Sequence, residues 1–213
     1  GNANFSTTVP GLASDSPIAF LAPVLIVMGV LSILVGGFGA VTRDSLEELF
    51  AYSSIGQIGF IAVPIGLAAA ASSESLRHLG ILGALVFAFH HAVTKGLLFL
   101  STGVVRDAVG TTQLSRLGGL ADRSPGFASV MLVGGLSLVG IPPLAGFFGK
   151  LFVFDAAARQ FAAASGSASV AAVALLVVLV VGALLTILYS TRAWMGTFWG
   201  SQTETVMAGR VDR

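Results

Sequence analysis

The sequence predicts an all-α integral membrane protein with five transmembrane helices. Hydrophobic residues make up 55% of the 213 residues and charged residues only 10%, whereas a water-soluble domain carries about 25% charged residues. The apolar residues also gather in five blocks, each long enough to cross a bilayer of roughly 30 Å, which takes about 20 helical residues. Backbone groups in lipid must be satisfied within their own segment, so each block is expected to be a helix.

The five blocks follow one another with short polar segments of Ser, Gly, Arg and Asp between them. The predicted spans are residues 18–41, 46–71, 79–105, 127–154 and 168–198. The first block lacks a basic lead-in and is too long for the apolar region of a signal peptide. Small residues recur at helical spacing on the first two spans, namely Ser32, Gly36, Ala40, Gly56 and Gly59. Such residues let helix backbones approach closely in lipid.

The loops between the spans predict the orientation. Arg77 and Arg159 fall on the same side as the N-terminus. Seven arginines fall on the other side, namely Arg43, Arg106, Arg116, Arg123, Arg192, Arg210 and Arg213. By the positive-inside rule this second side is cytoplasmic. We therefore expect an extracytoplasmic lead-in loop over residues 1–17, a five-helix membrane domain over 18–200 and a cytoplasmic tail over 201–213.

Composition excludes several kinds of chemistry. The chain has no cysteine, which removes disulfides, thiolate catalysis and iron–sulfur ligation. Its net charge of +1 gives no case for nucleic-acid binding. No carboxylate lies at helical ligand spacing from His90 or His91, so we expect no metal site, and the absence of a GxGxxG or P-loop pattern leads us to expect no cofactor. Residue 1 is glycine, so we expect a fragment, a processed product or one half of a split gene.

The two lysines have the most informative positions. All nine arginines fall in loops or at span ends, whereas Lys95 and Lys150, the only lysines, fall inside apolar spans. A positive charge at the centre of a membrane helix costs roughly 2.5–3.5 kcal/mol. Arginine keeps its charge almost everywhere, but a desolvated lysine can release its proton. A buried lysine is therefore a candidate proton carrier. The competing interpretation is that the lysines extend to the membrane interface.

The third span places a histidine beside one of these lysines. His91 and Lys95 are four residues apart and share a helix face, so the pair is a candidate for relaying a proton. His90 points about 100° away from that face, which favours a structural role or a place at the edge of a channel. Thr94 is a weaker candidate for the same polar path.

The fourth span contains a predicted helix break. Pro142 and Pro143 remove two backbone donors and interrupt the hydrogen-bond ladder. Broken membrane helices are tolerated where they are buried in protein or line a cavity, and an ionisable residue close to the break is typical of transporters. Lys150 follows about two turns later. A plain proline kink is the competing interpretation. On the second span, Ser53, Ser54 and Gln57 serve either as packing contacts or as parts of a polar path.

Four runs in this order resemble a known family. They are residues 49–59 (LFAYSSIGQIG), 91–99 (HAVTKGLLF), 118–120 (GGL) and 140–150 (GIPPLAGFFGK). Together they resemble the proton-translocating antiporter family, which includes the large subunits of Mrp-type sodium/proton antiporters and the antiporter-like L, M and N subunits of respiratory complex I. The resemblance covers about residues 18 to 200.

The resemblance implies a fold, a function and a set of partners. Family members contain two inverted five-helix repeats, and this chain looks like the second repeat alone, so another chain is expected to supply the first repeat. The family's proton path places Lys95 with His91 in the third span and Lys150 in the broken span. We expect protons and Na⁺ as transported ions, other membrane subunits as partners, and the cell membrane of a prokaryote as the location.

The choice of subunit type rests on two stretches. Lys150 followed by Leu-Phe resembles the D-type Mrp subunit or the N-type complex I subunit, and residues 189–200 (YSTRAWMGTFWG) favour the Mrp D type. The hypothesis is a proton-translocating subunit of a multisubunit sodium/proton antiporter, with no catalytic residue of its own. The alternatives are a non-redox, proton-pumping subunit of an NADH-quinone oxidoreductase and a non-conducting membrane scaffold.

Overall fold

The computed structural model describes residues 17–209 and confirms the predicted all-α fold. The helices are α1 (Pro17–Thr42), α2 (Leu46–Ala70), α3 (Glu74–Val109), the 3-10 helix η2 (Leu114–Arg116), α4 (Leu120–Arg123), α5 (Pro125–Val139), α6 (Ala145–Ala163), α7 (Ser167–Phe198) and α8 (Glu204–Ala208). By length and composition α1, α2, α3 and α7 can each cross a membrane, and α5 is a shorter apolar helix. Residues 1–16 of the loop predicted over 1–17, and the arginines at 210 and 213, lie outside the described residues.

Local sequence signals set where the long helices begin and end. Ser45 caps α2 by accepting a hydrogen bond from the Glu48 backbone N–H, and Ser73 caps α3 in the same way for Leu76. Gly110 ends α3 with φ +77°, a left-handed conformation that glycine adopts without steric cost. The 36-residue α3 is about 54 Å long. It therefore begins before and ends after the span predicted at residues 79–105.

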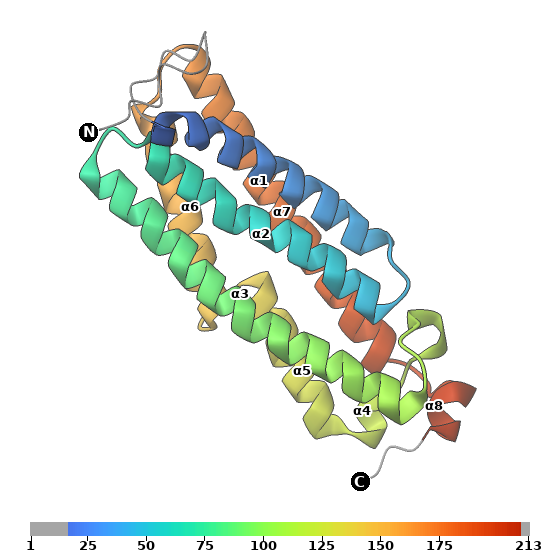
Figure 1. Ribbon diagram of the computed structural model, residues 1–213. Coiled ribbons are helices and arrows are strands. Elements are labelled where there is room, and N and C mark those ends of the chain that lie inside the picture. Colours follow the sequence, from blue (N-terminus) through green and yellow to red (C-terminus); the bar gives the residue numbers. More distant parts are fainter. Residues whose placement is uncertain (1–16, 210–213) are drawn as a thin grey trace, which may run out of the picture.

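The long helices form a bundle in which α2 holds a central place. Figure 1 shows α1, α2 and α3 running side by side, with α7 behind α1 and α2. Helix α2 contacts α1, α3, α6 and α7, and α3 also contacts α5 and α6. The predicted fourth span consists of α5 and α6 in succession, with residues 140–144 between them. The prediction of a break at Pro142–Pro143 is therefore confirmed, and α6 continues past the expected end of that span to Ala163.

Glycines bring α1 and α2 into close contact. A Cβ added at Gly36 would overlap the backbone of Gly56, and one added at Gly59 would overlap the backbone of α1. The Ser32 hydroxyl donates to the Ile55 carbonyl over 2.6 Å between the same two helices. The small-residue stripe predicted from the sequence therefore lies at the α1–α2 contact.

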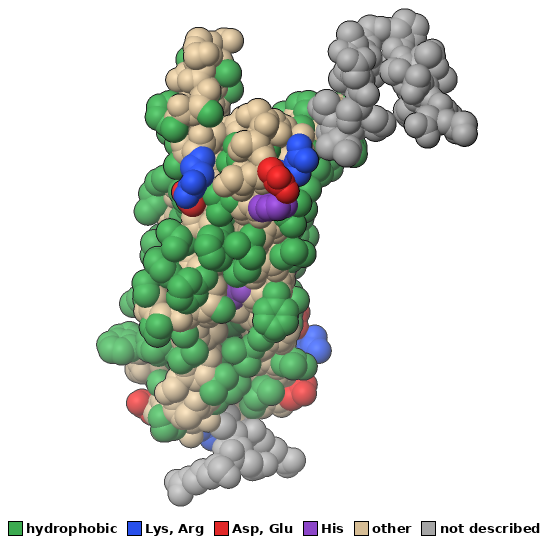
Figure 2. Space-filling model, turned by 90° about the vertical axis from the view of Figure 1, so that its left-hand side faces the viewer, with side chains coloured by type: hydrophobic (Ala, Val, Ile, Leu, Met, Phe, Trp, Pro, Cys, Tyr) green, Lys and Arg blue, Asp and Glu red, His purple; other side chains and the backbone are tan. Residues whose placement is uncertain are grey.

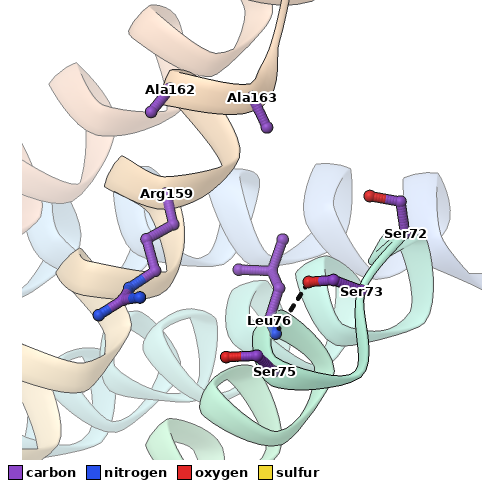
Figure 3. A pocket seen from close by; sticks show the side chains of 7 residues that line it. All are labelled: Ser72, Ser73, Ser75, Leu76, Arg159, Ala162 and Ala163. Atoms are coloured by element: carbon purple, nitrogen blue, oxygen red, sulfur yellow. Dashed lines mark hydrogen bonds between the residues drawn. The ribbon is translucent and has the colours of Figure 1, made fainter.

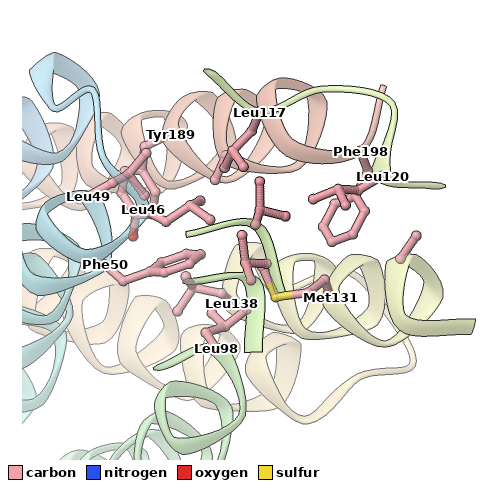
Figure 4. Packing of buried hydrophobic residues seen from close by; sticks show 14 of the residues in the cluster. Leu46, Leu49, Phe50, Leu98, Leu117, Leu120, Met131, Leu138, Tyr189 and Phe198 are labelled. Carbon is pink, nitrogen blue, oxygen red and sulfur yellow. The ribbon is translucent and has the colours of Figure 1, made fainter. Parts of the chain in front are cut away.

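Two apolar clusters fill the interior. The cluster in Figure 4 lies toward α4 and includes Leu46, Leu49, Leu98, Leu138 and Tyr189. The other lies toward the opposite end of the bundle, where Ile33, Phe60, Val63, Phe87 and Val153 pack together. Large apolar side chains also cover the outside of the bundle. Figure 2 shows this apolar belt, with charged side chains near the two ends, as expected for a protein surrounded by lipid.

Polar contacts fix the end of the bundle where α1 turns into α2. Arg192 of α7 donates to the carbonyls of Val41 and Arg43, at 2.6 and 2.5 Å, and pairs with Asp44. Val206 of α8 is fully buried at this end. Its carbonyl accepts a hydrogen bond from Arg123, and Thr203 donates to Arg116 O over 2.7 Å. Residues 203–208 thus pack onto the bundle, and the assignment of 201–213 to the cytoplasm stays a prediction.

We expect Gly36→Ala to destabilise the protein, because its methyl group would overlap the α2 backbone. Overpacking of this kind costs about 1–3 kcal/mol. The matched control is Gly96→Ala in α3, where no atom lies within 4 Å of an added Cβ and where alanine gains about 1 kcal/mol in helix propensity. The midpoint of thermal unfolding in detergent should fall for Gly36→Ala and stay level or rise for Gly96→Ala. Equal midpoints would contradict the close-packing account.

Candidate functional site

Lys95 lies in the interior, with its ammonium group turned toward α2. Only 5% of the residue is exposed. Its Nζ donates to the Phe50 carbonyl at 3.0 Å and to the Ser53 hydroxyl. The rings of Phe50 and Phe99 lie 5.4 and 6.0 Å from Nζ and add cation–π attraction. The side chain therefore bridges α3 to α2.

One carbonyl of α2 is the centre of this contact. Phe50 O accepts from the hydroxyls of Ser53 and Ser54, each at 2.9 Å, as well as from Lys95. Ser53 alone of the two serines also touches Lys95. Ser53 and Ser54 therefore differ in their contacts, although the sequence predicts the same role for both.

The break between α5 and α6 leaves helix-end carbonyls inside the protein. Gly140 ends α5 with φ +91°, and the N–H groups of Gly140 and Ile141 fold back to the Leu136 carbonyl. Pro142 and Pro143, joined by a cis peptide bond, then carry the chain to α6. The last carbonyls of a helix have no partner within the helix and need donors from elsewhere.

Lys150 supplies that donor. Its Nζ donates to Val139 O at 2.7 Å and to Leu138 O at 3.2 Å, and the Phe60 ring lies 5.5 Å away. Lys150 is buried on the second turn of α6. A positive charge at a helix C-terminus is also favoured by the helix dipole. Lys150 therefore joins the two halves of the broken span.

His90 lies on α3 and faces the broken span. It is 3% exposed. Its Nδ1 lies 3.1 Å from the Thr94 hydroxyl and 3.4 Å from the Ser137 hydroxyl of α5. A Cβ at Gly146 would lie 2.8 Å from its Nε2, so the ring also packs against the first turn of α6. His90 thus connects α3 to both halves of the broken span, and its role as a structural residue or at the edge of a channel stays a prediction.

His91 lies in a different environment. It is half-buried, and its buried Nδ1 has no hydrogen-bond partner among the described residues. It is one turn from Lys95 in sequence, but Lys95 donates its hydrogen bonds to α2. The pairing of His91 with Lys95 as a proton relay stays a prediction.

A second polar group joins α2 to α7. The Gln57 amide nitrogen donates to the Tyr189 hydroxyl at 2.7 Å and to the Thr186 hydroxyl at 3.0 Å. All three residues are buried at about 1% exposure or less. Gln57 was predicted from the sequence, but Thr186, Tyr189 and Ser137 were missed. The available signal was the spacing of Thr186 and Tyr189, which are polar, three residues apart and inside the apolar fifth span.

The acidic residues lie elsewhere. Each ion pair among the described residues sits at an end of the bundle, and Asp155 pairs with Arg159 at 3.0 Å. Neither Lys95 nor Lys150 has a carboxylate partner within residues 17–209. The same part of the chain has no cluster of three His, Asp or Glu side chains for a metal ion.

A surface cavity of about 370 Å³ is separate from the lysines. It lies where α2 turns into α3 and where α6 ends (Figure 3), and its lining includes Ser72, Ser75 and Arg159. None of the buried polar residues described above lines it. The candidate site is therefore the chain of buried groups between the helices rather than this cavity.

The chain belongs to the NADH:quinone oxidoreductase/Mrp antiporter transmembrane family, whose model matches residues 9–186. It is 31% identical over 186 residues to the D-type subunit of the Na⁺/H⁺ antiporter of Alkalihalophilus pseudofirmus, covering 87% of this chain and 34% of that protein. It is 34% identical over 198 residues to NAD(P)H-quinone oxidoreductase chain 4 1 of a Synechococcus species, covering 90% of this chain and 34% of that protein. The chain thus spans about a third of the length of these relatives.

The fold also resembles part of one chain in a solved membrane complex. A chain in the structure of the Mrp complex from Dietzia sp. superposes with a TM-score of 0.73 at 29% identity, over 87% of this chain and 31% of that one. The predicted family resemblance is therefore confirmed.

The two neighbouring serines of α2 provide a test of the Lys95 contact. Ser53→Ala removes a hydrogen-bond partner of a buried charge, a contact that contributes roughly 1.5–3 kcal/mol. Ser54→Ala removes only a hydroxyl that bonds the Phe50 carbonyl. At neutral pH the thermal midpoint of the detergent-solubilised protein should fall further for Ser53→Ala than for Ser54→Ala. Similar midpoints would argue against the Lys95–Ser53 contact.

Proposed function

We propose that the chain is a proton-translocating, antiporter-like membrane subunit that works within a multisubunit Na⁺/H⁺ antiporter. The observation that carries this proposal is the position of the only two lysines. Both are buried between helices and are bonded to carbonyls and a hydroxyl rather than to carboxylates. A charge in this setting lacks a permanent counter-ion, so each lysine is suited to hold a proton temporarily.

The proposed path runs along the helices that the lysines join. Protons reach Lys95 between α2 and α3 and pass by way of Thr94, His90 and Ser137 toward Lys150. Thr94 is the chain neighbour of Lys95, and His90 lies within hydrogen-bonding distance of Thr94 and Ser137. Hydroxyl groups both donate and accept, and His90 Nδ1, which both hydroxyls contact, takes up and releases a proton, so each member is able to pass a proton onward.

The sodium coupling is proposed to depend on partner subunits. The A. pseudofirmus relative is a subunit of a Na⁺/H⁺ antiporter, and this chain covers about a third of it. We propose that other membrane subunits, including a chain with the first five-helix repeat, complete the assembly in a prokaryotic cell membrane. The arginine-rich end that holds Arg43, Arg106 and Arg192 supports a cytoplasmic position for that end of the bundle.

The second candidate is the proton-pumping arm of a respiratory complex. The Synechococcus relative, a chain of an NAD(P)H-quinone oxidoreductase, supports it at a similar level of identity. The lysines would have the same roles in both assemblies. Mass spectrometry of the complex purified from native membranes separates the two, since flavin and iron–sulfur proteins are expected only with the respiratory complex.

Replacing Lys95 with alanine tests the function. In the complete complex, proton-coupled transport into membrane vesicles should fall by roughly a hundredfold, because a positioned proton carrier is lost. The complex should still assemble. Arg77→Ala, an exposed change at the other end of the bundle, is the control and should transport normally. Normal transport by Lys95→Ala would instead favour the scaffold interpretation, in which methionine is also tolerated at both lysine positions.

The adjacent histidines offer a matched pair for the path. His90→Leu removes the buried ring that contacts Thr94 and Ser137, whereas His91→Leu changes a half-buried side chain. Transport by the complete complex should fall by roughly a hundredfold or more for His90→Leu, within the range expected for proton transfer groups. His91→Leu should have a smaller effect. The reverse order would place the relay at His91, one turn from Lys95.

A further inference from the structure

The arginines at the end of the bundle where α1 turns into α2 differ in their partners. Three of them bond to a carboxylate or a carbonyl of the described chain, namely Arg106, Arg123 and Arg192. Arg43 is half-buried, yet it forms no ion pair within residues 17–209, and its buried Nε has no hydrogen-bond partner there. A guanidinium keeps its charge almost everywhere, so Arg43 is suited to bind an anion from another molecule.

Tyr52 of α2 holds the Arg43 side chain in place. The guanidinium carbon lies over the Tyr52 ring, 4.5 Å from its centre, which is within the range of cation–π attraction. A Cβ at Gly39 would overlap this ring, so the glycine gives the ring its room against α1. A guanidinium held in this way loses little further freedom when it binds, and its flat fork of N–H groups matches the oxygens of a phosphate or a carboxylate.

An apolar surface continues from this group toward the middle of the bundle. Its members follow Gly39 and Tyr52 at spacings of three or four residues on the two helices, namely Leu31 and Val35 on α1 and Ile55 and Ile58 on α2. All four side chains are 43–59% exposed, and α1 packs directly against α2. A ligand with a charged head at Arg43 would therefore find an apolar surface for a hydrocarbon tail.

This end of the bundle also carries the aromatic side chains typical of a membrane interface. Trp194 and Trp199, the only tryptophans, lie near the end of α7 with ring centres 6.0 Å apart. Arg192 of the same helix donates to the carbonyls of Val41 and Arg43. Tryptophan and tyrosine rings prefer the depth of the lipid headgroups. The Arg43 guanidinium is therefore expected at the depth of the lipid phosphates.

We propose that Arg43, stacked on Tyr52, binds the phosphate group of a membrane phospholipid whose acyl chain lies on Leu31, Val35 and Ile55. Phosphate recognition by arginine uses paired, charge-assisted hydrogen bonds. The apolar surface beside the guanidinium favours a lipid over free phosphate, since only the lipid has a tail to cover it. The site is independent of the proposed transport function, because it lies away from both lysines and its occupancy is measured without transport.

The first test is a cryo-EM map of the complete complex in nanodiscs of phosphatidylglycerol, a lipid whose only charge is its phosphate. We expect phosphate density about 2.7–2.9 Å from a guanidinium nitrogen of Arg43, continuous with acyl-chain density on Val35 and Ile55. A carboxylate bound to Arg43 instead would overturn the proposal, whether it comes from a partner subunit or from Glu48, one helical turn before Tyr52.

A matched pair of arginine variants tests the site in solution. The detergent-solubilised complex is crosslinked to phosphatidylglycerol with a photoreactive acyl chain, and the labelled peptides of α1 and α2 are quantified by mass spectrometry. Labelling should fall roughly fivefold for Arg43→Gln, the effect expected for one basic residue at a membrane surface. Arg116→Gln removes an exposed arginine that has no ion pair within residues 17–209 and should label like the parent. Equal labelling of both variants would overturn the site.

The stacking on Tyr52 and the source of the phosphate are tested in the same assay. Tyr52→Leu removes the ring and should lower the labelling, whereas Tyr52→Phe keeps the ring and should label like the parent. Parent-like labelling of Tyr52→Leu would overturn the stacked geometry. Excess inorganic phosphate should leave the labelling unchanged. If inorganic phosphate abolishes the labelling, the site prefers free phosphate and the assignment to a lipid fails.

Discussion

The structure depends on one constraint, which is the need to hold two ammonium groups in an interior that contains no buried carboxylate among residues 17–209. A carboxylate would neutralise each lysine permanently, and an unpaired charge there would be costly. The protein instead offers backbone carbonyl oxygens as acceptors. The break after Val139 exposes the last carbonyls of α5 to Lys150, while on intact α2 a single carbonyl, that of Phe50, serves Lys95. At both lysines, the partial negative charges of carbonyl oxygens thus take the place of the full negative charge of a carboxylate.

The packing of the bundle serves this arrangement. The glycine contacts hold α1 close against α2, and α2 in turn carries the residues that face both lysines. Phe50 belongs to one apolar cluster and Phe60 to the other, so the polar groups lie in contact with both clusters. Close packing on either side restricts how far Ser53 and Gln57 can move. The positions of the donors and acceptors are therefore set by large apolar contacts.

Much of the fold could be predicted because the relevant signals are local. The lengths of the apolar runs predict the membrane spans, and the two prolines predict the helix break. The contrast between lysine and arginine positions indicates the candidate proton carriers. The rotation of each helix could not be predicted in the same way. Spacing places His91 and Lys95 on one face of α3, but only packing against α5 and α6 decides that His90 is buried among polar groups. Tyr189 and Thr186 were missed for the same reason, since their partner Gln57 is 129 or more residues away in sequence.

The bond between Lys150 and the open end of α5 has a thermodynamic consequence. Lys150 belongs to one half of the broken span, and both of its carbonyl acceptors belong to the other half. The ammonium form donates to both carbonyls, whereas a neutral amine would bind them less firmly. Protonation of Lys150 therefore affects the distance between α5 and α6, and that distance in turn affects how strongly Lys150 holds its proton. A neighbouring protein that pulls α5 away from α6 would alter how strongly the proton is held without touching the lysine.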